Sequence, residues 1–229
     1  MTSVGVVSFG GSNCDEDVVK ALKSLDLDVE ARLVWYKDSL EGCDAAVLPG
    51  GFSYGDYLRA GAIAARTPIM DDVRAMAEAG KPVLGICNGA QVLAEAGLVP
   101  GAFTDNLSAR FQCRSTYVRV EDADTPFTRE FTEGEVVEIP IAHAEGRYVS
   151  GDADPESLAV FRYVDEDGRT TDDANPNGSE MHLAGVRGSS NVLAMMPHPE
   201  RRRDSLLGHD EGLRVFESMA RAADRVEAA

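Results

Sequence analysis

Short apolar runs alternate with amphipathic stretches along the first half of the chain. The apolar runs have the length and composition of buried strands, whereas the stretches between them place apolar residues every three or four positions, as helices do. The predicted strands are residues 3–9, 29–35, 45–48 and 83–86, and the predicted helices are residues 15–25 and 69–79. This alternation predicts βαβ units, and therefore an α/β fold with a mostly parallel, twisted sheet that carries helices on both faces.

The second half of the chain is richer in predicted strands. The dipeptide Asp167-Gly168 lies between apolar runs and predicts a β-hairpin. Residues 210–223 have the pattern of an amphipathic helix. The sequence contains no internal repeat, linker or low-complexity tract, so we expect residues 1–229 to form a single domain.

The net charge of the chain limits the kinds of partner that are expected. The 39 acidic residues outnumber the 22 basic ones, which gives a net charge of −17. Such a field repels phosphate backbones, so nucleic acid is not an expected partner. High ionic strength would screen the self-repulsion of so acidic a chain, which favours a salt-loving source, and plain solubility is the alternative explanation. The basic run 201–203 is expected to be a solvated or partner-facing patch.

The cysteines and the apolar runs bear on the location of the protein. The four cysteines show neither paired nor Cys-x-x-Cys spacing. No N-terminal apolar run approaches the length of a signal peptide or a membrane span. We therefore expect a reduced, cytoplasmic protein that contacts no membrane. No set of histidines and cysteines has metal-ligand spacing, so no metal site is expected.

A glycine-flanked cysteine is the first candidate for chemistry. Cys87 follows the predicted strand 83–86 and precedes a helix-like run, with Gly85 and Gly89 two positions to either side. Small residues at these positions let the chain turn sharply from strand to helix around the cysteine. A thiol at a helix N-terminus favours the thiolate, and the next backbone N–H, that of Asn88, could hold a developing oxyanion. A buried structural cysteine is the alternative, because the pattern is short.

A second constellation lies far downstream of the cysteine. Two prolines flank His198 and are expected to hold that segment extended after an apolar run. Residues two apart in an extended chain project to the same side, so His198 and Glu200 would leave the strand end together. Cysteine, histidine and carboxylate can then form a catalytic relay, in which His198 accepts the thiol proton of Cys87 and Glu200 orients the imidazole.

These residues resemble the triad-type (class I) glutamine amidotransferases, in which a glycine-flanked cysteine elbow is followed by a strand ending in His-x-Glu. Within that family the chain is similar to the glutaminase subunits of phosphoribosylformylglycinamidine synthase. The segment 49–64, Pro-Gly-Gly-Phe-Ser-Tyr-Gly-Asp-Tyr-Leu-Arg-Ala-Gly-Ala-Ile-Ala, carries much of the likeness. Shorter matching segments are residues 11–15, 141–148, 175–179 and 196–201. The resemblance covers nearly the whole chain and implies a flavodoxin-like α/β fold.

The resemblance also implies further site residues. The loop after the predicted strand 45–48 would supply a second oxyanion N–H, which we place at Gly51, beside that of Asn88. A plain turn is the alternative for this loop. The residues that would contact or support the bound substrate are Gly50, Phe52, Gln91 and His143.

The reaction implied by the family begins with attack of Cys87 on the side-chain amide of L-glutamine. The chain has no Gly-x-x-x-x-Gly-Lys-Ser/Thr loop, so no cofactor is expected in it, and ATP and Mg are expected on a partner. The family implies two partners, a large ATP-dependent synthase subunit and a small bridging subunit. The complex would use the ammonia to convert formylglycinamide ribonucleotide to formylglycinamidine ribonucleotide in de novo purine biosynthesis. We also expect the isolated chain to be a weak glutaminase, because partner docking would organise its pocket.

Three alternatives share part of the pattern. The glutaminase of pyridoxal phosphate synthesis has the same elbow and His-x-Glu triplet, but it is not expected to carry the loop 52–56. A redox sensor or chaperone of similar fold would need Cys87 but not the pair formed by His198 and Glu200. A catalytically inactive binding subunit is the third class.

Overall fold

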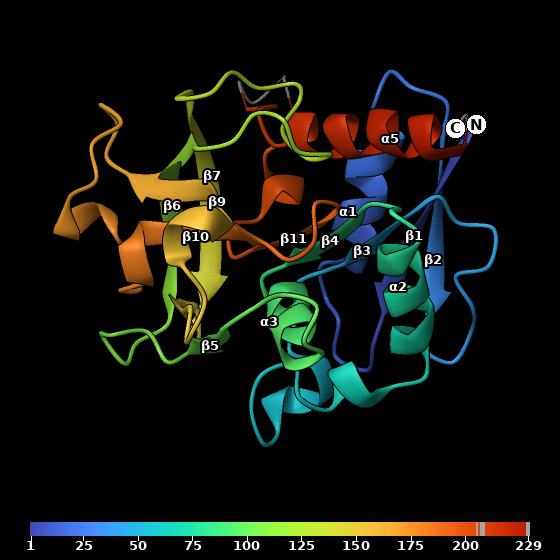
Figure 1. Cartoon of the computed structure of the whole chain (residues 1–229), viewed down its shortest axis with the longest axis horizontal. Coiled ribbons are helices and arrows are strands. Elements are labelled where there is room, and N and C mark those ends of the chain that lie inside the picture. Colours follow the sequence, from blue (N-terminus) through green and yellow to red (C-terminus); the bar gives the residue numbers. More distant parts are fainter. Residues whose placement is uncertain (205, 207–208, 228–229) are drawn as a thin grey trace.

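The computed structural model describes residues 1–204, 206 and 209–227. In this part of the chain, nine strands form one central sheet (Figure 1). These strands are β1 (Thr2–Ser8), β2 (Val29–Trp35), β3 (Ala45–Leu48), β4 (Val83–Ile86), β6 (Gln112–Val120), β7 (Val136–His143), β9 (Ala159–Val164), β10 (Leu183–Arg187) and β11 (Val192–Met195). Their order across the sheet is β2-β1-β3-β4-β11-β10-β9-β6-β7. Two short strands, β5 (Ala102–Thr104) and β8 (Arg147–Val149), pair separately.

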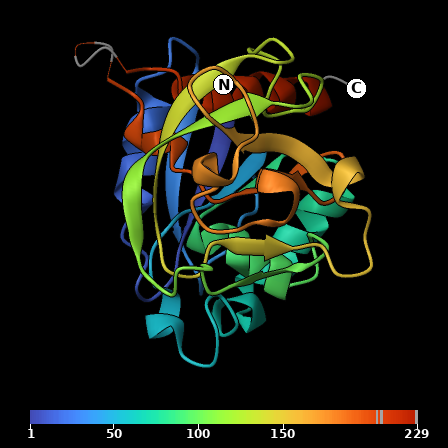
Figure 2. The same ribbon diagram turned by 90° about the vertical axis from the view of Figure 1, so that its left-hand side faces the viewer.

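The sheet has a parallel half and an antiparallel half. Strands β2, β1, β3, β4 and β11 run parallel to one another, whereas β10, next to β11, begins a run of antiparallel pairings that continues through β9, β6 and β7. Every residue of β3 and β4 is buried, as expected for strands covered on both faces. The predicted α/β fold built on a mostly parallel sheet is confirmed, and the antiparallel strands, which face the viewer in Figure 2, extend it.

Helices cover both faces of the parallel half, as predicted. Helices α1 and α5 lie on one face, and α2 and α3 lie on the other (Figure 1). Fully buried side chains such as Leu22 and Phe216 fill the first interface, and Ile69 and Leu93 fill the second. Burial of these apolar faces holds the helices on the sheet. The bounds are α1 (Asp15–Lys23), α2 (Ile69–Glu78), α3 (Asn88–Glu95), α4 (Pro155–Leu158) and α5 (Leu213–Glu227).

The predicted hairpin at Asp167-Gly168 is wrong in its second strand. Strand β9 does end in a tight turn, in which the N–H of Asp165 donates to the carbonyl of Arg169. The chain then forms a short 3₁₀ helix at Asp172–Ala174 instead of a strand. The reason is that β9 already lies between β10 and β6, so neither of its edges is free for a returning strand.

None of the helices in the described residues combines the length and the apolar character that crossing a bilayer requires. The last helix begins later than predicted, at Leu213, and continues to Glu227.

The parallel half of the sheet sets the location of the candidate site, because the carboxyl ends of its strands deliver loops to one edge of the sheet.

Candidate active site

Cys87 lies in a sharp turn between β4 and α3. Its backbone has φ 50° and ψ −107°, a conformation that non-glycine residues adopt only under strain and that is typical of a nucleophile elbow. A Cβ atom at Gly85 would lie 2.7 Å from the carbonyl oxygen of Gly89, and one at Gly89 would overlap the carbonyl oxygen of Leu48. Both flanking glycines are therefore required by close backbone approaches, as the sequence predicts.

His198 and Glu200 follow the end of β11. The Nδ1 atom of His198 lies 2.6 Å from Oε1 of Glu200, and the side chains are 1% and 0% exposed. A carboxylate can only accept, so this bond places a proton on Nδ1, and Nε2 is the ring nitrogen that can exchange a proton with Cys87. Burial by itself lowers the pKa of His198, but the charges of Glu200 and Cys87 outweigh burial and raise the pKa well above its usual range. The structure therefore brings the three residues of the predicted relay together.

The segment that carries this pair is not extended throughout. His198 itself is extended, with φ −103° and ψ 88°, but Pro199 begins one turn of 3₁₀ helix that ends at Arg201. Proline is compatible with the first position of a helix, because its missing N–H would have no partner there. The prediction of an extended His-Pro-Glu triplet is therefore wrong, although the two side chains do meet.

The two glycines after β3 approach the elbow. A Cβ atom at Gly50 would lie 2.7 Å from Cε1 of His198, and one at Gly51 would lie 2.8 Å from the carbonyl oxygen of Gly11. These positions therefore admit no side chain. The N–H of Asn88 belongs to the first turn of α3, where N–H groups have no partner within the helix. The predicted oxyanion donors, Gly51 and Asn88, thus flank the cysteine from two different segments.

A small cavity of about 30 Å³ lies beside Cys87. Three of the four predicted substrate contacts line it, namely Phe52, Gln91 and His143, whereas Gly50 is not among its lining residues. A volume of this size holds only one or two water molecules. The cavity must therefore widen before an amino acid can enter. The lining residues are Gly51, Phe52, Asp56, Cys87, Gln91, Ala142, His143, Ala144 and Glu145.

Asn106 fixes the orientation of His143. The Nδ2 atom of Asn106 donates to the carbonyl oxygens of Arg110 and His143, so its Oδ1 must be the acceptor that faces Nδ1 of His143 at 3.1 Å. The Nε2 atom of His143 then carries a free lone pair. Burial and the positive charge of His198 lower the pKa of His143 to about 4, so its imidazole is neutral near pH 7.

Two acidic residues of the cavity were not predicted as site residues. Burial first, and then the charge of Glu145, raise the pKa of Asp56 to about 6. With a pKa of about 6, Asp56 is mostly ionised near pH 7, so this side of the cavity carries negative charge, which suits an ammonium group. Both acids lie inside segments that carry the family resemblance, 49–64 and 141–148. Their place in these segments is the feature of the sequence that could have identified them as site residues.

Cys14 is a second cysteine close to the His–Glu pair. One ligand atom each of Cys14, His198 and Glu200 lie within 4.8 Å of one another. The guanidinium of Arg201 lies 3.4 Å from the Cys14 sulfur and 3.8 Å from Glu200, and it already supplies positive charge there. The absence of a metal from the site stays a prediction.

The basic run 201–203 was expected to form a solvated or partner-facing patch. This expectation is wrong at Arg202, which is buried and lies 2.6 Å from Glu138.

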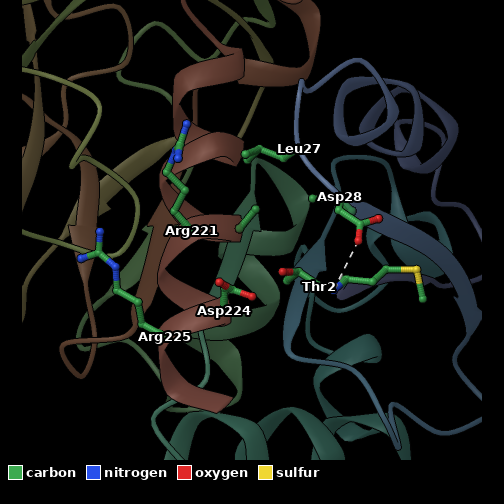
Figure 3. A pocket seen from close by; sticks show the side chains of 9 residues that line it. Thr2, Leu27, Asp28, Arg221, Asp224 and Arg225 are labelled. Atoms are coloured by element: carbon green, nitrogen blue, oxygen red, sulfur yellow. Dashed lines mark ion pairs between the residues drawn. The ribbon is translucent and has the colours of Figure 1, made fainter. Parts of the chain in front are cut away.

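A larger cavity of about 260 Å³ lies at the opposite end of the sheet (Figure 3). It is lined by Thr2 and Asp28 on one side and by Arg221, Asp224 and Arg225 of α5 on the other. Thr2 begins β1, whereas Cys87 follows the end of β4, and the parallel half of the sheet gives these ends opposite edges. This cavity is therefore separate from the candidate site.

A cysteine elbow at the carboxyl edge of parallel strands, beside a His–Glu pair, is the arrangement of a glutamine amidotransferase. Residues 1–210 match the family described as the CobB/CobQ-like glutamine amidotransferase domain.

Individual relatives narrow the family. The chain is 58% identical over 224 residues to phosphoribosylformylglycinamidine synthase subunit PurQ of Methanosarcina mazei, with 95% of this chain and 96% of the relative covered. It is 55% identical over 222 residues to the same subunit of Natronomonas pharaonis, with 94% and 98% covered. A chain in the structure of PurLQS from Thermotoga maritima matches with a TM-score of 0.85 and 44% identity, over 95% of this chain and 97% of that one. The chain therefore belongs to the PurQ family of glutamine amidotransferases, and the resemblance inferred from its sequence is confirmed.

Proposed function

We propose that this chain hydrolyses L-glutamine as the glutaminase subunit of a phosphoribosylformylglycinamidine synthase. The observation that carries the proposal is the meeting of a strained cysteine elbow, which lines a small cavity, with a buried His–Glu pair whose imidazole interacts with Cys87. The 58% identity to a PurQ subunit supports the choice of this synthase over other amidotransferases.

In the proposed mechanism, His198 takes the proton of Cys87 through Nε2, and Glu200 stabilises the imidazolium that results. The Cys87 thiolate attacks the amide carbon of glutamine, and the backbone N–H groups of Gly51 and Asn88 hold the tetrahedral oxyanion. The C–N bond then breaks, His198 returns the proton to the leaving ammonia, and a glutamyl thioester remains. Water, deprotonated by His198, cleaves the thioester and releases glutamate.

Substrate binding is assigned to the lining of the cavity. Gln91 and His143 offer hydrogen-bonding groups, and Phe52 provides an apolar wall. The carboxylates of Asp56 and Glu145 would face the α-ammonium group of glutamine, since opposite charges attract strongly where water is largely excluded. Gly50 acts indirectly, because its lack of a side chain leaves room for the His198 ring.

The ammonia must reach an acceptor without escaping to water, so the proposal includes partners. The T. maritima relative was solved as PurLQS, which supports a large ATP-dependent synthase subunit and a small bridging subunit here as well. ATP and Mg²⁺ would bind the synthase partner, in a cytoplasmic complex of purine biosynthesis. The small volume beside Cys87 supports the expectation that the isolated chain is a weak glutaminase.

Labelling with an alkylating glutamine analogue tests the proposal. The complex should take up one label, and peptide mapping should place it on Cys87. His198→Ala should slow the labelling by at least about a hundredfold, in line with the usual size of general-base effects. Cys113 is the internal control, because it is exposed and should react only with non-specific reagents. Glutamine hydrolysis that persists in Cys87→Ala would contradict the proposal.

A further inference from the structure

The side chain of Asn88 is buried at 2% exposure, directly after the cysteine. Its Oδ1 accepts the backbone N–H of Ser53 at 3.0 Å. Its Nδ2 donates to Oε1 of Gln91 at 3.0 Å and to Oδ1 of Asp56 at 3.3 Å. The backbone N–H of Ser53 can only donate, so the orientation of the amide is fixed. One side chain thus joins the elbow, the loop after β3 and the first turns of α3.

The loop that Asn88 contacts is strained. Tyr54, Asp56 and Leu58 have φ values of 54°, 53° and 73°, in the left-handed region that non-glycine residues disfavour. Tyr57 and Leu58 are 73% and 90% exposed, so the outer side of the loop has little packing to hold it. Backbone bonds to the N-terminal loop hold its first residues. The bonds to Asn88 tie this part of the loop to the start of α3, whereas Arg59 binds Glu95 at the far end of that helix.

This connection matters for the two oxyanion donors. The N–H of Gly51 belongs to the loop, and the N–H of Asn88 belongs to the helix. Stabilisation of an oxyanion needs both donors near 3 Å from the same point, and displacement of a catalytic group by about 1 Å can reduce a rate about a hundredfold. The distance between the donors therefore depends on what joins the two segments. Ser53, two residues after Gly51, is where the Asn88 side chain joins them.

We propose that the Asn88 side chain is a positioning residue for glutamine hydrolysis, which fixes the Gly51 loop and the Gln91 side chain relative to the Cys87 elbow. The inference rests on the proposed function, in which the N–H groups of Gly51 and Asn88 hold the oxyanion. It assigns to the side chain a role separate from that of the Asn88 backbone.

The test compares Asn88→Ala and Asn88→Asp with the unchanged chain, each assembled with its synthase partners. Asn88→Ala keeps the backbone N–H but removes all three side-chain bonds, and kcat should fall about 10- to 100-fold. Asn88→Asp keeps the shape and the acceptor for Ser53, but it loses the donors to Gln91 and Asp56 and adds a carboxylate beside that of Asp56, so its kcat should also fall. The affinity for glutamine, measured by calorimetry in a Cys87→Ala background, should fall less than kcat does, because Gln91 is only one of the groups that would bind the substrate. A role in general pocket structure would weaken both quantities together.

Asn191→Ala is the matched control. Asn191 is also buried, and its Nδ2 donates to the carbonyl oxygens of Ala77 and Lys81, before the amino end of β4. This variant should lose thermal stability as Asn88→Ala does, with kcat unchanged.

Three results would overturn the inference. The first is a kcat within about twofold of the unchanged chain in both Asn88 variants. The second is a loss of kcat in Asn191→Ala as large as that in Asn88→Ala. The third is a loss of glutamine affinity in the Asn88 variants as large as their loss of kcat. If Asn88→Ala does not fold, Asn88→Asp decides, because it has the same shape. An active Cys87→Ala chain would instead show that the proposed function itself is wrong, so the two failures are distinguishable.

Discussion

The backbone of Gly89 packs directly against the carbonyl group of Leu48, so closely that a Cβ atom at Gly89 would overlap the Leu48 oxygen. Leu48 is the last residue of β3, and Gly89 lies in the first turn of α3. The contact therefore sets how near the helix that follows the nucleophile lies to the strand that leads into the Gly50-Gly51 loop.

Gly89→Ala should damage activity more than stability alone explains. The added methyl group must push α3 away from β3, and overpacking of this kind costs about 1–3 kcal/mol. Because the same shift separates Asn88 from Gly51, kcat should fall at least about tenfold. Gly80→Ala is the control, since its φ of 77° makes alanine strained although nothing lies within 4 Å. It should lower the melting temperature but leave kcat unchanged, and equal kcat values in the two variants would contradict the argument.

His143 should make the protein less stable in mild acid. Burial and the charge of His198 lower its pKa to about 4, whereas an unfolded histidine has a pKa of about 6.5. The unfolded chain therefore binds a proton first, and the stability due to this group is present above pH 6.5 and lost as the pH falls toward 4. A shift from 6.5 to 4 corresponds to about 3 kcal/mol.

Urea unfolding at pH 7 and pH 4.5 checks this prediction. The unchanged chain should lose more stability between these pH values than His143→Gln does, because glutamine does not titrate. The variant will also be less stable at pH 7, since the contact with Asn106 changes. The diagnostic quantity is therefore the difference between the two proteins in the stability lost from pH 7 to pH 4.5. Equal losses would show that His143 does not titrate as described.

Asp56→Asn should raise stability and lower activity at the same time. Burial and the charge of Glu145 raise the pKa of Asp56 to about 6, so its carboxylate destabilises the native state increasingly as the pH rises from about 4 to about 6. Partial exposure screens this cost, and we expect a gain of about 1 kcal/mol for the variant at pH 7.5 and none at pH 4.

The activity of Asp56→Asn separates a functional charge from an accidental one. If the carboxylate faces the α-ammonium group of glutamine, KM should rise at least about tenfold. Asp26→Asn, an exposed acid outside the cavity, should change neither stability nor KM. If Asp56→Asn leaves KM unchanged, the Asp56 carboxylate has no role in substrate binding.

Local sequence patterns predicted the elements that carry Cys87. They did not predict the contacts between segments that lie far apart in the sequence. Strands β3 and β4 have their predicted bounds, because short apolar runs between turns are buried on both faces. The flanking glycines of Cys87 were predictable for the same local reason. The bonds from Asn88 to Ser53 and Asp56, and the approach of Cys14 to His198, join segments far apart in the sequence. No periodicity encodes such contacts.

Partner binding should act on the cavity and not on the thiol itself. The space beside Cys87 is about 30 Å³, too small for glutamine, so the synthase partners should raise the rate of Cys87 labelling by an alkylating glutamine analogue at least about tenfold. Labelling of Cys87 by the small reagent iodoacetamide, followed by peptide mapping to set aside the exposed Cys113, should change less than about threefold. Equal stimulation of both reagents would show that the partners act on the thiolate, and no stimulation of either would show that the cavity opens without them.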